Sequence, residues 1–324
     1  MRVLVTGATG FTGGHLARAL RSRGHEVVAF VRDEDRGAPL AALGIELRVG
    51  DLAEPASVRP AVAGCDVVYH IAALYREARH GDDLYRRVNV DGTRHLVEAS
   101  ASAGVSRFVH CSTVGVHGDV AVPADESAPF APGDVYQETK LLGEQLVQQH
   151  IERGFPGVIF RPVGIHGPGD QRFLKLFRTV ARGQFVMIGS GSVLYHLTYI
   201  DDLVEGIVLC GEHPAARGQT YILAGDRYTT LEELVAKIAA AVGRKPRRGH
   251  IPLFPVKVAA VLCEALCKPL GIEPPLHMRR LDFFTKDRGF SSDKARRELG
   301  FAPRVSLDEG IARTIRWYRE QNLL

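Results

Sequence analysis

The amino-acid sequence predicts an α/β fold in which a doubly wound parallel sheet is followed by a smaller mixed C-terminal lobe. Three observations carry this prediction. Strand-like and helix-like segments alternate over residues 1–160, a glycine-rich turn directly follows the first strand, and short irregular segments replace this alternation after Arg161-Pro162. A chain of 324 residues is long enough for two domains. We expect the first domain over residues 1–165 and the second mainly over 166–324, with some segments returning to the first.

Each element follows from the spacing of its apolar residues. Short apolar, β-branched runs predict strands, and apolar residues three or four positions apart predict helices. Helices of this length between consecutive strands are crossovers, which make the sheet parallel and place helices on both of its faces. The predicted strands are 2–6, 26–31, 45–49, 66–71, 107–111 and 158–160, and the predicted helices are 11–23, 55–63, 84–103 and 135–153.

The composition excludes several classes of protein. Hydrophobic residues make up 45% of the chain and charged residues 24%, which is ordinary for a globular protein and excludes disordered and fibrous classes. The net charge of +4 is too small for a concentrated basic surface, so we expect no nucleic-acid partner. The five cysteines, an odd number, favour reduced thiols over a disulfide framework. The 13 histidines lack the spacing of metal ligands, so we expect no metal site.

The distribution of apolar residues argues against a membrane span, because no run of about 20 uncharged apolar residues occurs. The most apolar segment, 255–271, contains Lys257, Glu264 and Lys268, and we expect it to form a packed helix of the second lobe. The apolar run at the N-terminus is too short for a signal peptide. These features together favour a cytoplasmic location.

The turn between the first predicted strand and the first predicted helix contains three regularly spaced glycines. They fall at positions 7, 10 and 13, a spacing typical of Rossmann-type dinucleotide-binding domains. Glycine permits the tight turn and lets the backbone approach a pyrophosphate, which accepts hydrogen bonds from N–H groups at the helix N-terminus. The expected cofactor-binding residues of this turn are Gly7, Thr9, Gly10, Phe11, Thr12 and Gly13.

The end of the second predicted strand bears on the choice of cofactor. An acidic side chain at this place binds the ribose 2′-hydroxyl of NAD, whereas an arginine pairs with the 2′-phosphate of NADP. Both types occur here, as Arg32 and Asp33, and Arg32 comes first after the strand. We therefore favour NADP(H) and keep NAD(H) as the alternative. A surface pair of Arg32 and Asp33 without any ligand contact is a third interpretation.

Two further strand ends supply expected cofactor contacts. Asp51 follows the third strand, where its carboxylate could reach the adenine amino group, and Leu52 is its neighbour. Ala72 and Ala73 follow the fourth strand and are small enough to let a flat cofactor pass. All four positions lie at carboxyl ends of strands, where open α/β sheets bind ligands.

A tyrosine and a lysine lie near the start of the long helix predicted over 135–153. Tyr136 and Lys140 are four positions apart and so share one helix face. A free phenol has a pKa of about 10, so acid–base work near neutral pH requires that pKa to fall by about 3, which corresponds to about 4 kcal/mol. A neighbouring ammonium and an oxidised nicotinamide supply such stabilisation. Ser112 and Thr113, after the fifth strand, offer a hydroxyl that can hold a substrate oxygen.

These motifs together resemble the extended short-chain dehydrogenase/reductase family, which is also described as the NAD-dependent epimerase/dehydratase family. Weaker matches at 198–206 and 291–303 extend the resemblance over nearly the whole chain. Within the family, Arg32, Gly164 and the HLTYIDD segment look most like the dihydroflavonol-reductase and 3β-hydroxysteroid-dehydrogenase branches. The strongest matches are TGATGFTGG at 6–14, GDL at 50–52, HIAA at 70–73, NVDGT at 89–93, STVGVHG at 112–118, YQETK at 136–140 and RPVGIHGPGD at 161–170.

The resemblance implies an NAD(P)(H)-dependent oxidoreductase that transfers a hydride at a carbinol or carbonyl carbon of a small-molecule substrate. It implies that Tyr136 is the proton donor and acceptor, and that Lys140 holds the nicotinamide ribose and lowers the tyrosine pKa. It places the substrate-oxygen hydroxyl at Thr113, with Ser112 as the second choice.

The resemblance also implies supporting roles. Asn89 would buttress the active-site helix, and Pro162-Val163 would contact the carboxamide end of the cofactor. The helices predicted over 84–103 and 135–153 resemble the pair that forms a four-helix dimer interface in this family, which implies a homodimer.

Departures from the family pattern bear on the substrate. His117 and His166 stand where the family usually has tyrosine, and Gly164 stands where many nucleotide-diphosphate-sugar epimerases have asparagine. These departures weaken the alternative of a sugar-nucleotide epimerase or dehydratase with tightly bound NAD. That alternative stays open, because Lys286 or Arg288 could bind a diphosphate. The expected substrate contacts are Leu74, His117, His166, His196 and Arg288.

A non-catalytic cofactor-binding scaffold is a third alternative. It is disfavoured because such a protein would be expected to have lost the Tyr136–Lys140 pair, which is intact here.

Overall fold

The structure is a computed structural model that describes residues 1–75, 81–245, 249–267, 274–276 and 278–324. Its largest element is a seven-stranded sheet in which all neighbouring strands are parallel. In sheet order the strands are β10 (Thr220–Leu223), β6 (Gly157–Pro162), β5 (Arg107–Cys111), β4 (Val67–His70), β1 (Arg2–Thr6), β2 (Glu26–Val31) and β3 (Glu46–Val49).

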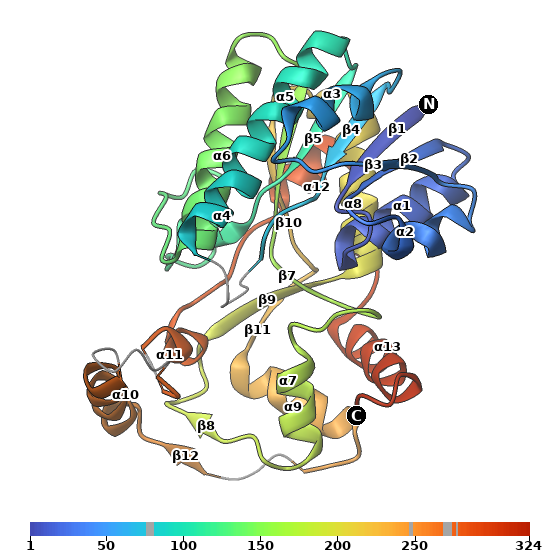
Figure 1. Ribbon diagram of the computed structural model, residues 1–324. Coiled ribbons are helices and arrows are strands. Elements are labelled where there is room, and N and C mark those ends of the chain that lie inside the picture. The colour runs from blue at the N-terminus through green and yellow to red at the C-terminus, as the bar shows by residue number, and fades with distance from the viewer. Residues whose placement is uncertain (76–80, 246–248, 268–273, 277) are drawn as a thin grey trace.

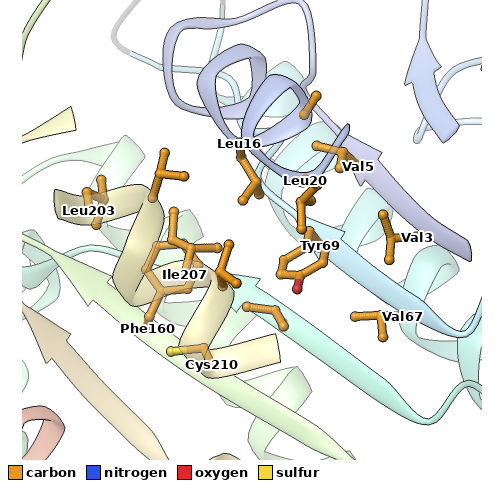
Figure 2. Packing of buried hydrophobic residues seen from close by; sticks show 14 of the residues in the cluster. Val3, Val5, Leu16, Leu20, Val67, Tyr69, Phe160, Leu203, Ile207 and Cys210 are labelled. Atoms are coloured by element: carbon orange, nitrogen blue, oxygen red, sulfur yellow. The ribbon is translucent and has the colours of Figure 1, made fainter. Parts of the chain in front are cut away.

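Helices cover both faces of this sheet (Figure 1), so the predicted Rossmann-type doubly wound fold is confirmed. On one face, α1 (Phe11–Ser22) and α8 (Ile200–Glu212) pack against the strands; Figure 2 shows Leu16 and Leu20 of α1 near Tyr69. Leu16 and Leu20 are one helical turn apart, which is why both reach the same core. On the other face lie α3 (Pro55–Val62), α5 (Gly92–Ala103) and α6 (Val135–Glu152).

The strand order reverses between β1 and β4, and the chain segments that leave these two strands come very close together. Gly7 has a φ of +70°, and a Cβ on it would lie 2.8 Å from backbone atoms of Ala72. A Cβ on Gly13 would lie 2.2 Å from the carbonyl oxygen of Gly7. Only glycine therefore fits at these two places. At such a reversal, an open parallel sheet binds its ligands in a crevice at the carboxyl ends of the strands.

The second lobe combines two small sheets with helices. One sheet is mixed, because β9 (Leu194–Tyr199) pairs parallel with β7 (Gly164–His166) and antiparallel with β11 (Tyr228–Thr230). The lobe's own hydrophobic core lies between this sheet and three helices. The remaining elements are β8 (Met187–Ile188), β12 (His250–Ile251), α7 (Leu174–Ala181), α9 (Leu231–Ala241), α10 (Leu253–Cys267), α11 (Met278–Thr285) and α13 (Leu307–Glu320).

Elements from the second half of the chain also complete the first unit. Both α8 and α12 (Asp293–Leu299) contribute to the core beside α1, and β10 is the edge strand next to β6. The domain boundary at residue 165 stays a prediction. Although the segment after β6 builds the second lobe, the chain returns to the large sheet more than once.

Two helical segments of the first unit differ from the sequence-based expectation. The helix α2 (Glu34–Ala41) is not predicted, because it contains Gly37 and Pro39, which are poor helix formers. It begins nevertheless, since the Asp33 carboxylate caps its first turn. The helix predicted over 84–103 is in fact α4 (Asp82–Arg86), a π-helical turn (Arg87–Asp91) and α5. Such turns have no signature in apolar spacing.

Among the described residues, no helix is long and apolar enough to cross a bilayer, and no three potential metal-ligating side chains form a group.

The close approach at Gly13 gives a direct stability test. We expect Gly13→Ala to lower the free energy of unfolding by about 3 kcal/mol, because the new methyl group overlaps a backbone oxygen that cannot move alone. Gly14→Ala is the matched control; its Cβ would lie 3.1 Å from the Ala8 carbonyl oxygen, and we expect a change of about 1 kcal/mol or less. Urea unfolding of the two variants measures the difference, and equal stability would contradict the packing described here.

Candidate active site

The N-terminus of α1 is open to an anion. Gly10 is the N-cap residue, no side chain caps the helix, and the first turn contains no acidic residue. Thr9 and Gly10 are exposed, while Phe11 and Thr12 are half-buried. The first backbone N–H groups of α1 and the positive end of its dipole therefore lie at the crevice without a side-chain partner. This arrangement fits a phosphate group.

Arg32 and Asp33 follow β2 and are both exposed, but they are used differently. The Asp33 carboxylate accepts hydrogen bonds from the N–H groups of Asp35 at 3.0 Å and Arg36 at 3.3 Å. The Arg32 guanidinium forms no ion pair with any residue that the structure describes, Asp33 included. The cation at this strand end is therefore free for a ligand, and the carboxylate is engaged as a helix cap.

The two other predicted strand ends lie along the same edge of the sheet. Asp51 is half-buried, and its Oδ1 accepts a hydrogen bond from the Ala53 N–H at 2.9 Å. Leu52 is buried, and its carbonyl oxygen accepts a hydrogen bond from the His95 ring at 2.9 Å. Ala72 and Ala73 are half-buried, and the Ala72 backbone lies directly beside Gly7 of the glycine-rich turn.

Tyr136 and Lys140 lie one turn apart on α6. The helix begins at Val135 because the Asp134 carboxylate caps it, accepting a hydrogen bond from the Gln137 N–H at 2.8 Å. Lys140 is buried, and its ammonium donates a hydrogen bond to the Cys111 carbonyl oxygen at 2.5 Å, at the end of β5. Burial lowers the pKa of Lys140 from its ordinary value. The Tyr136 ring meets the edge of Tyr75, with centroids 4.9 Å apart.

The two hydroxyls after β5 have different environments. Ser112 is buried and donates its proton to the Glu144 carboxylate. Thr113 is half-buried, and its oxygen accepts a hydrogen bond from the Gly115 N–H at 3.1 Å. A hydroxyl that accepts one bond still has a proton to donate. The geometry therefore favours Thr113 over Ser112 as a contact for a substrate oxygen.

Ser112 belongs to a buried charged network that the sequence did not reveal. Glu144 lies one turn beyond Lys140 on α6 and forms a buried ion pair with Arg161 of β6 at 2.5 Å. Arg161 also donates hydrogen bonds to Nε2 of His117 at 3.0 Å and to the Glu126 carbonyl oxygen at 3.0 Å. The only advance signal is the spacing of Tyr136, Lys140 and Glu144, which places all three on one helix face.

His117 has both ring nitrogens engaged in this network. A guanidinium can only donate, so Nε2 of His117 accepts from Arg161 and Nδ1 carries the proton. That proton is donated to the Pro129 carbonyl oxygen at 3.2 Å. Burial and the neighbouring Arg161 lower the pKa of His117, which keeps the ring neutral. The role of His117 as a substrate contact stays a prediction.

Asn89 connects the segment after β4 with α6. Its side-chain amide donates hydrogen bonds to the Leu74 carbonyl oxygen at 3.2 Å and to the Thr139 hydroxyl at 3.1 Å. Its side-chain oxygen accepts one from the Leu74 N–H at 2.8 Å. Asn89 and Leu74 are both buried. Through these bonds Asn89 supports α6 at Thr139 and holds the backbone of Leu74 in place.

A chain of uncharged hydrogen bonds links this support to the glycine-rich turn. The Ala72 N–H donates to the Thr6 hydroxyl at 3.2 Å, which donates to Nδ1 of His70 at 2.9 Å. Nε2 of His70 donates to the Thr93 hydroxyl at 3.0 Å, which donates to the Asn89 carbonyl oxygen at 2.7 Å. Because each hydroxyl has one proton, this set of bonds determines which nitrogen of His70 is protonated.

The other predicted substrate contacts are held by internal bonds. His166 is buried with Nδ1 3.4 Å from the Thr314 hydroxyl on α13. His196 is buried; its Nδ1 accepts from the Phe290 N–H at 3.4 Å and its Nε2 donates to the Gly225 carbonyl oxygen at 3.0 Å. These two histidines therefore have structural partners, and their contact with a substrate stays a prediction.

Arg288 and the nearby Lys286 are also engaged. Arg288 donates hydrogen bonds to the Tyr195 hydroxyl at 3.1 Å and to the Lys286 carbonyl oxygen at 3.3 Å. The Lys286 ammonium lies 3.0 Å from the Asp282 carboxylate. Pro162 and Val163 are buried where β6 meets β10.

Arg172 is a site residue that the sequence-based prediction missed. Its guanidinium lies 5.3 Å from the ring centroid of Phe11, in the glycine-rich turn, and 5.8 Å from that of Tyr75. Asp170 at 3.1 Å and the Ile165 carbonyl oxygen at 2.9 Å fix its orientation. Arg172 thus places a cation between the start of α1 and the ring that packs on Tyr136.

Comparison with known proteins identifies the family. Residues 3–224 match the model of the NAD dependent epimerase/dehydratase family. The chain belongs to this family. It is thus an NAD(P)-dependent oxidoreductase of the extended short-chain dehydrogenase/reductase type, which confirms the expected family and the expectation of an enzyme.

Several relatives of similar length are enzymes that the chain resembles over nearly its whole length. It is 34% identical over 318 residues to a 4-hydroxy-2-methyl-3-oxo-4-farnesyl-3,4-dihydroquinoline-1-oxide ketoreductase of Stigmatella aurantiaca, covering 96% of this chain and 95% of the relative. It is 34% identical over 338 residues to a 3-beta-hydroxysteroid dehydrogenase of Mycolicibacterium neoaurum, covering 98% and 92%. The solved structure of gox2253 is 33% identical, with a TM-score of 0.85 and 99% of both chains covered.

The neutral His70 gives a pH-dependent prediction. Burial lowers its pKa from 6.5 to about 3, so between these values the unfolded chain binds one proton that the native protein does not. Stability is therefore lost as the pH falls from 6.5 toward 3, by about 1.4 kcal/mol per pH unit for this residue. We expect His70→Gln, which keeps a donor and an acceptor but does not titrate, to remove that contribution.

The measurement is urea unfolding of wild type and variant at several acidic pH values. The stability gap between them should change in favour of the variant by about 2.7 kcal/mol over two pH units. A gap that stays constant with pH would show that His70 is protonated in the native state.

Proposed function

We propose that the protein reduces a ketone, or oxidises the corresponding secondary alcohol, on an apolar small molecule, with Tyr136 as the acid–base group. One observation carries this proposal. Lys140, one turn from Tyr136, is buried and hydrogen-bonded to the carbonyl oxygen of Cys111, which directly precedes Ser112 and Thr113. The cation one turn from the proton-transfer group is thereby attached to the strand end that leads into the two hydroxyls.

The residues at the crevice fit a nicotinamide dinucleotide. The test is the cradle at the start of α1, where a Cβ on Gly7 or Gly13 would collide with backbone and where no side chain occupies the N–H groups. These N–H groups would hold the pyrophosphate, and Ala72 and Ala73 would flank the cofactor. When bound, the nicotinamide supplies or accepts the hydride.

The chain's own residues handle the proton. Tyr136 donates its phenolic proton to the carbonyl oxygen of a ketone, or takes the hydroxyl proton of an alcohol in the reverse direction. Lys140 favours the phenolate, because a positive charge nearby lowers the pKa of an acidic group. Thr113 donates a hydrogen bond to the same substrate oxygen and so orients it.

Three observations support an apolar substrate over a sugar nucleotide. The cations that a diphosphate would need, Lys286 and Arg288, are engaged with Asp282 and with internal oxygens. At position 164, where many sugar-nucleotide epimerases have asparagine, a Cβ would lie 2.6 Å from the Leu197 side chain. The similar enzymes named above act on a farnesylated quinoline and on a steroid.

We further propose that NADP(H) is the preferred cofactor. The support is the contrast between the free guanidinium of Arg32 and the carboxylate of Asp33, which is engaged in capping α2. A 2′-phosphate would pair with Arg32, whereas the ribose hydroxyls of NAD would need the carboxylate to leave its cap. A homodimer formed through α5 and α6 stays a prediction.

The acid–base role is tested by Tyr136→Phe. We expect turnover of a 3β-hydroxysteroid or a 3-oxoalkanoate to fall about 10³-fold, because the ring remains but the proton does not. Cofactor affinity, measured by fluorescence titration, should change little. Tyr75→Phe is the matched control, since it removes a hydroxyl from the ring packed against Tyr136, and should keep activity within a few-fold. Turnover by Tyr136→Phe at the control's rate would rule out the assignment.

The cofactor preference is tested by Arg32→Ala. We expect the Kd for NADPH to rise about tenfold or more, because a charged hydrogen bond to the 2′-phosphate is lost. The Kd for NADH, which lacks that phosphate, serves as the internal control and should not change. Equal losses for the two nucleotides would remove the basis for preferring NADP(H).

A further inference from the structure

The helix α10 exposes an apolar stripe that the packed-helix expectation does not explain. Its large side chains at positions 254, 258, 261, 262 and 266 are between 43% (Val258) and 77% (Phe254) exposed. These positions follow helical spacing and so lie on one face. Ala260 is the only buried residue that α10 contributes. Figure 1 shows α10 at the outer edge of the second lobe, beside α11 and away from the large sheet.

The stretch of sequence that contains this stripe is strongly positive. Residues 244–280 contain eight Lys and Arg residues and two Glu residues, so this segment alone carries +6, more than the net +4 of the whole chain. Among its described residues, Arg244, Lys245 and Lys257 are exposed. Glu264 is engaged, because its carboxylate accepts a hydrogen bond from the Met278 N–H at 2.7 Å. An exposed acidic residue near this segment is Glu232 of α9, whose carboxylate lies 3.8 Å from the ring of His250.

We propose that α10 is a peripheral membrane anchor that lies in the surface of an anionic lipid bilayer. The apolar stripe would enter the boundary between headgroups and acyl chains, and the basic residues would face the phosphates. A helix of 15 residues is about 22 Å long, which is too short for a hydrocarbon core of about 30 Å, and it contains Lys257 and Glu264. It therefore lies on the membrane and does not cross it.

Charge decides between this occupant and the alternatives. A second copy of the chain would bring one segment of +6 against another, and like charges oppose such a contact. Nucleic acid would match the charge, but it is bound through phosphate contacts and stacking on aromatic rings, and four of the five side chains of the stripe are aliphatic. An anionic bilayer offers a negative surface and an apolar layer together. This proposal concerns a surface apart from Tyr136 and does not depend on the proposed substrate.

The test is sedimentation of the full chain with sucrose-loaded vesicles. Vesicles of phosphatidylcholine with about one third phosphatidylglycerol should bind the protein, and vesicles of phosphatidylcholine alone should bind it far more weakly. The double variant Phe254→Glu, Leu266→Glu should lose roughly tenfold or more in the partition coefficient. Lys257→Glu should lose about fivefold on the anionic vesicles only.

The matched control is the double variant Ala42→Glu, Leu43→Glu, which adds the same charges at two exposed apolar positions of the first unit, just after α2. It should bind vesicles like the wild type. All variants should retain the wild-type melting temperature and NADPH affinity, which excludes misfolding. Failure of the wild type to bind anionic vesicles, or full binding by Phe254→Glu, Leu266→Glu, would overturn the proposal. So would a dimer that this variant dissociates while vesicle binding is absent, since the stripe would then be an interface between copies.

Discussion

The position of α6 is determined by two buried charges, and the rest of the site depends on that position. Lys140 and Glu144 are one turn apart, and both are almost fully buried. An isolated buried charge costs several kcal/mol, so each must meet its partner: the Cys111 carbonyl at the end of β5 for Lys140, and Arg161 of β6 for Glu144. A slide or rotation of α6 would break both contacts. Tyr136, one turn before Lys140, is thereby held over the same strand ends.

A second set of contacts joins this helix to the cofactor side of the crevice, and it contains no charge at all. The hydrogen bonds from Ala72 through His70 to Asn89 use groups whose donors and acceptors are all matched. A buried network of this kind rigidifies a site only when every member is satisfied. Protonation of His70 would give Nδ1 a proton facing the hydroxyl of Thr6. The row of hydrogen bonds is therefore continuous only while His70 is neutral, which agrees with the strongly lowered pKa of His70.

The parts of the structure that the sequence predicts are those governed by local rules. The glycine spacing at 7, 10 and 13 predicts the turn after β1, because a close backbone approach leaves no other residue possible. β10 was not predicted, because a segment of four residues becomes a strand only by pairing with β6, some 60 positions away in the sequence. The ion pair of Glu144 with Arg161 was not predicted for the same reason, although the sequence shows that Glu144 lies one helical turn from Lys140. The hydrogen bonds of His166, His196 and Arg288 likewise join segments that are distant in sequence. The sequence therefore could not show that these three side chains have partners within the protein.

The contrast between local rules and long-range contacts also explains why the type of reaction is easier to infer from the sequence than the substrate. The groups proposed to react follow a strand end or lie on the helix attached to one, and a parallel sheet brings strand ends to one edge whatever its loops contain. The second lobe has no such rule, and its polar side chains are largely used on one another: Arg288 on Tyr195, His196 on Gly225 and Lys286 on Asp282. With Lys286 and Arg288 engaged in this way, neither cation is available to bind a charged substrate. In the proposed reaction, discrimination between substrates would then depend on the shape of apolar surface and on the hydroxyl of Thr113, which suits an extended apolar ketone or alcohol.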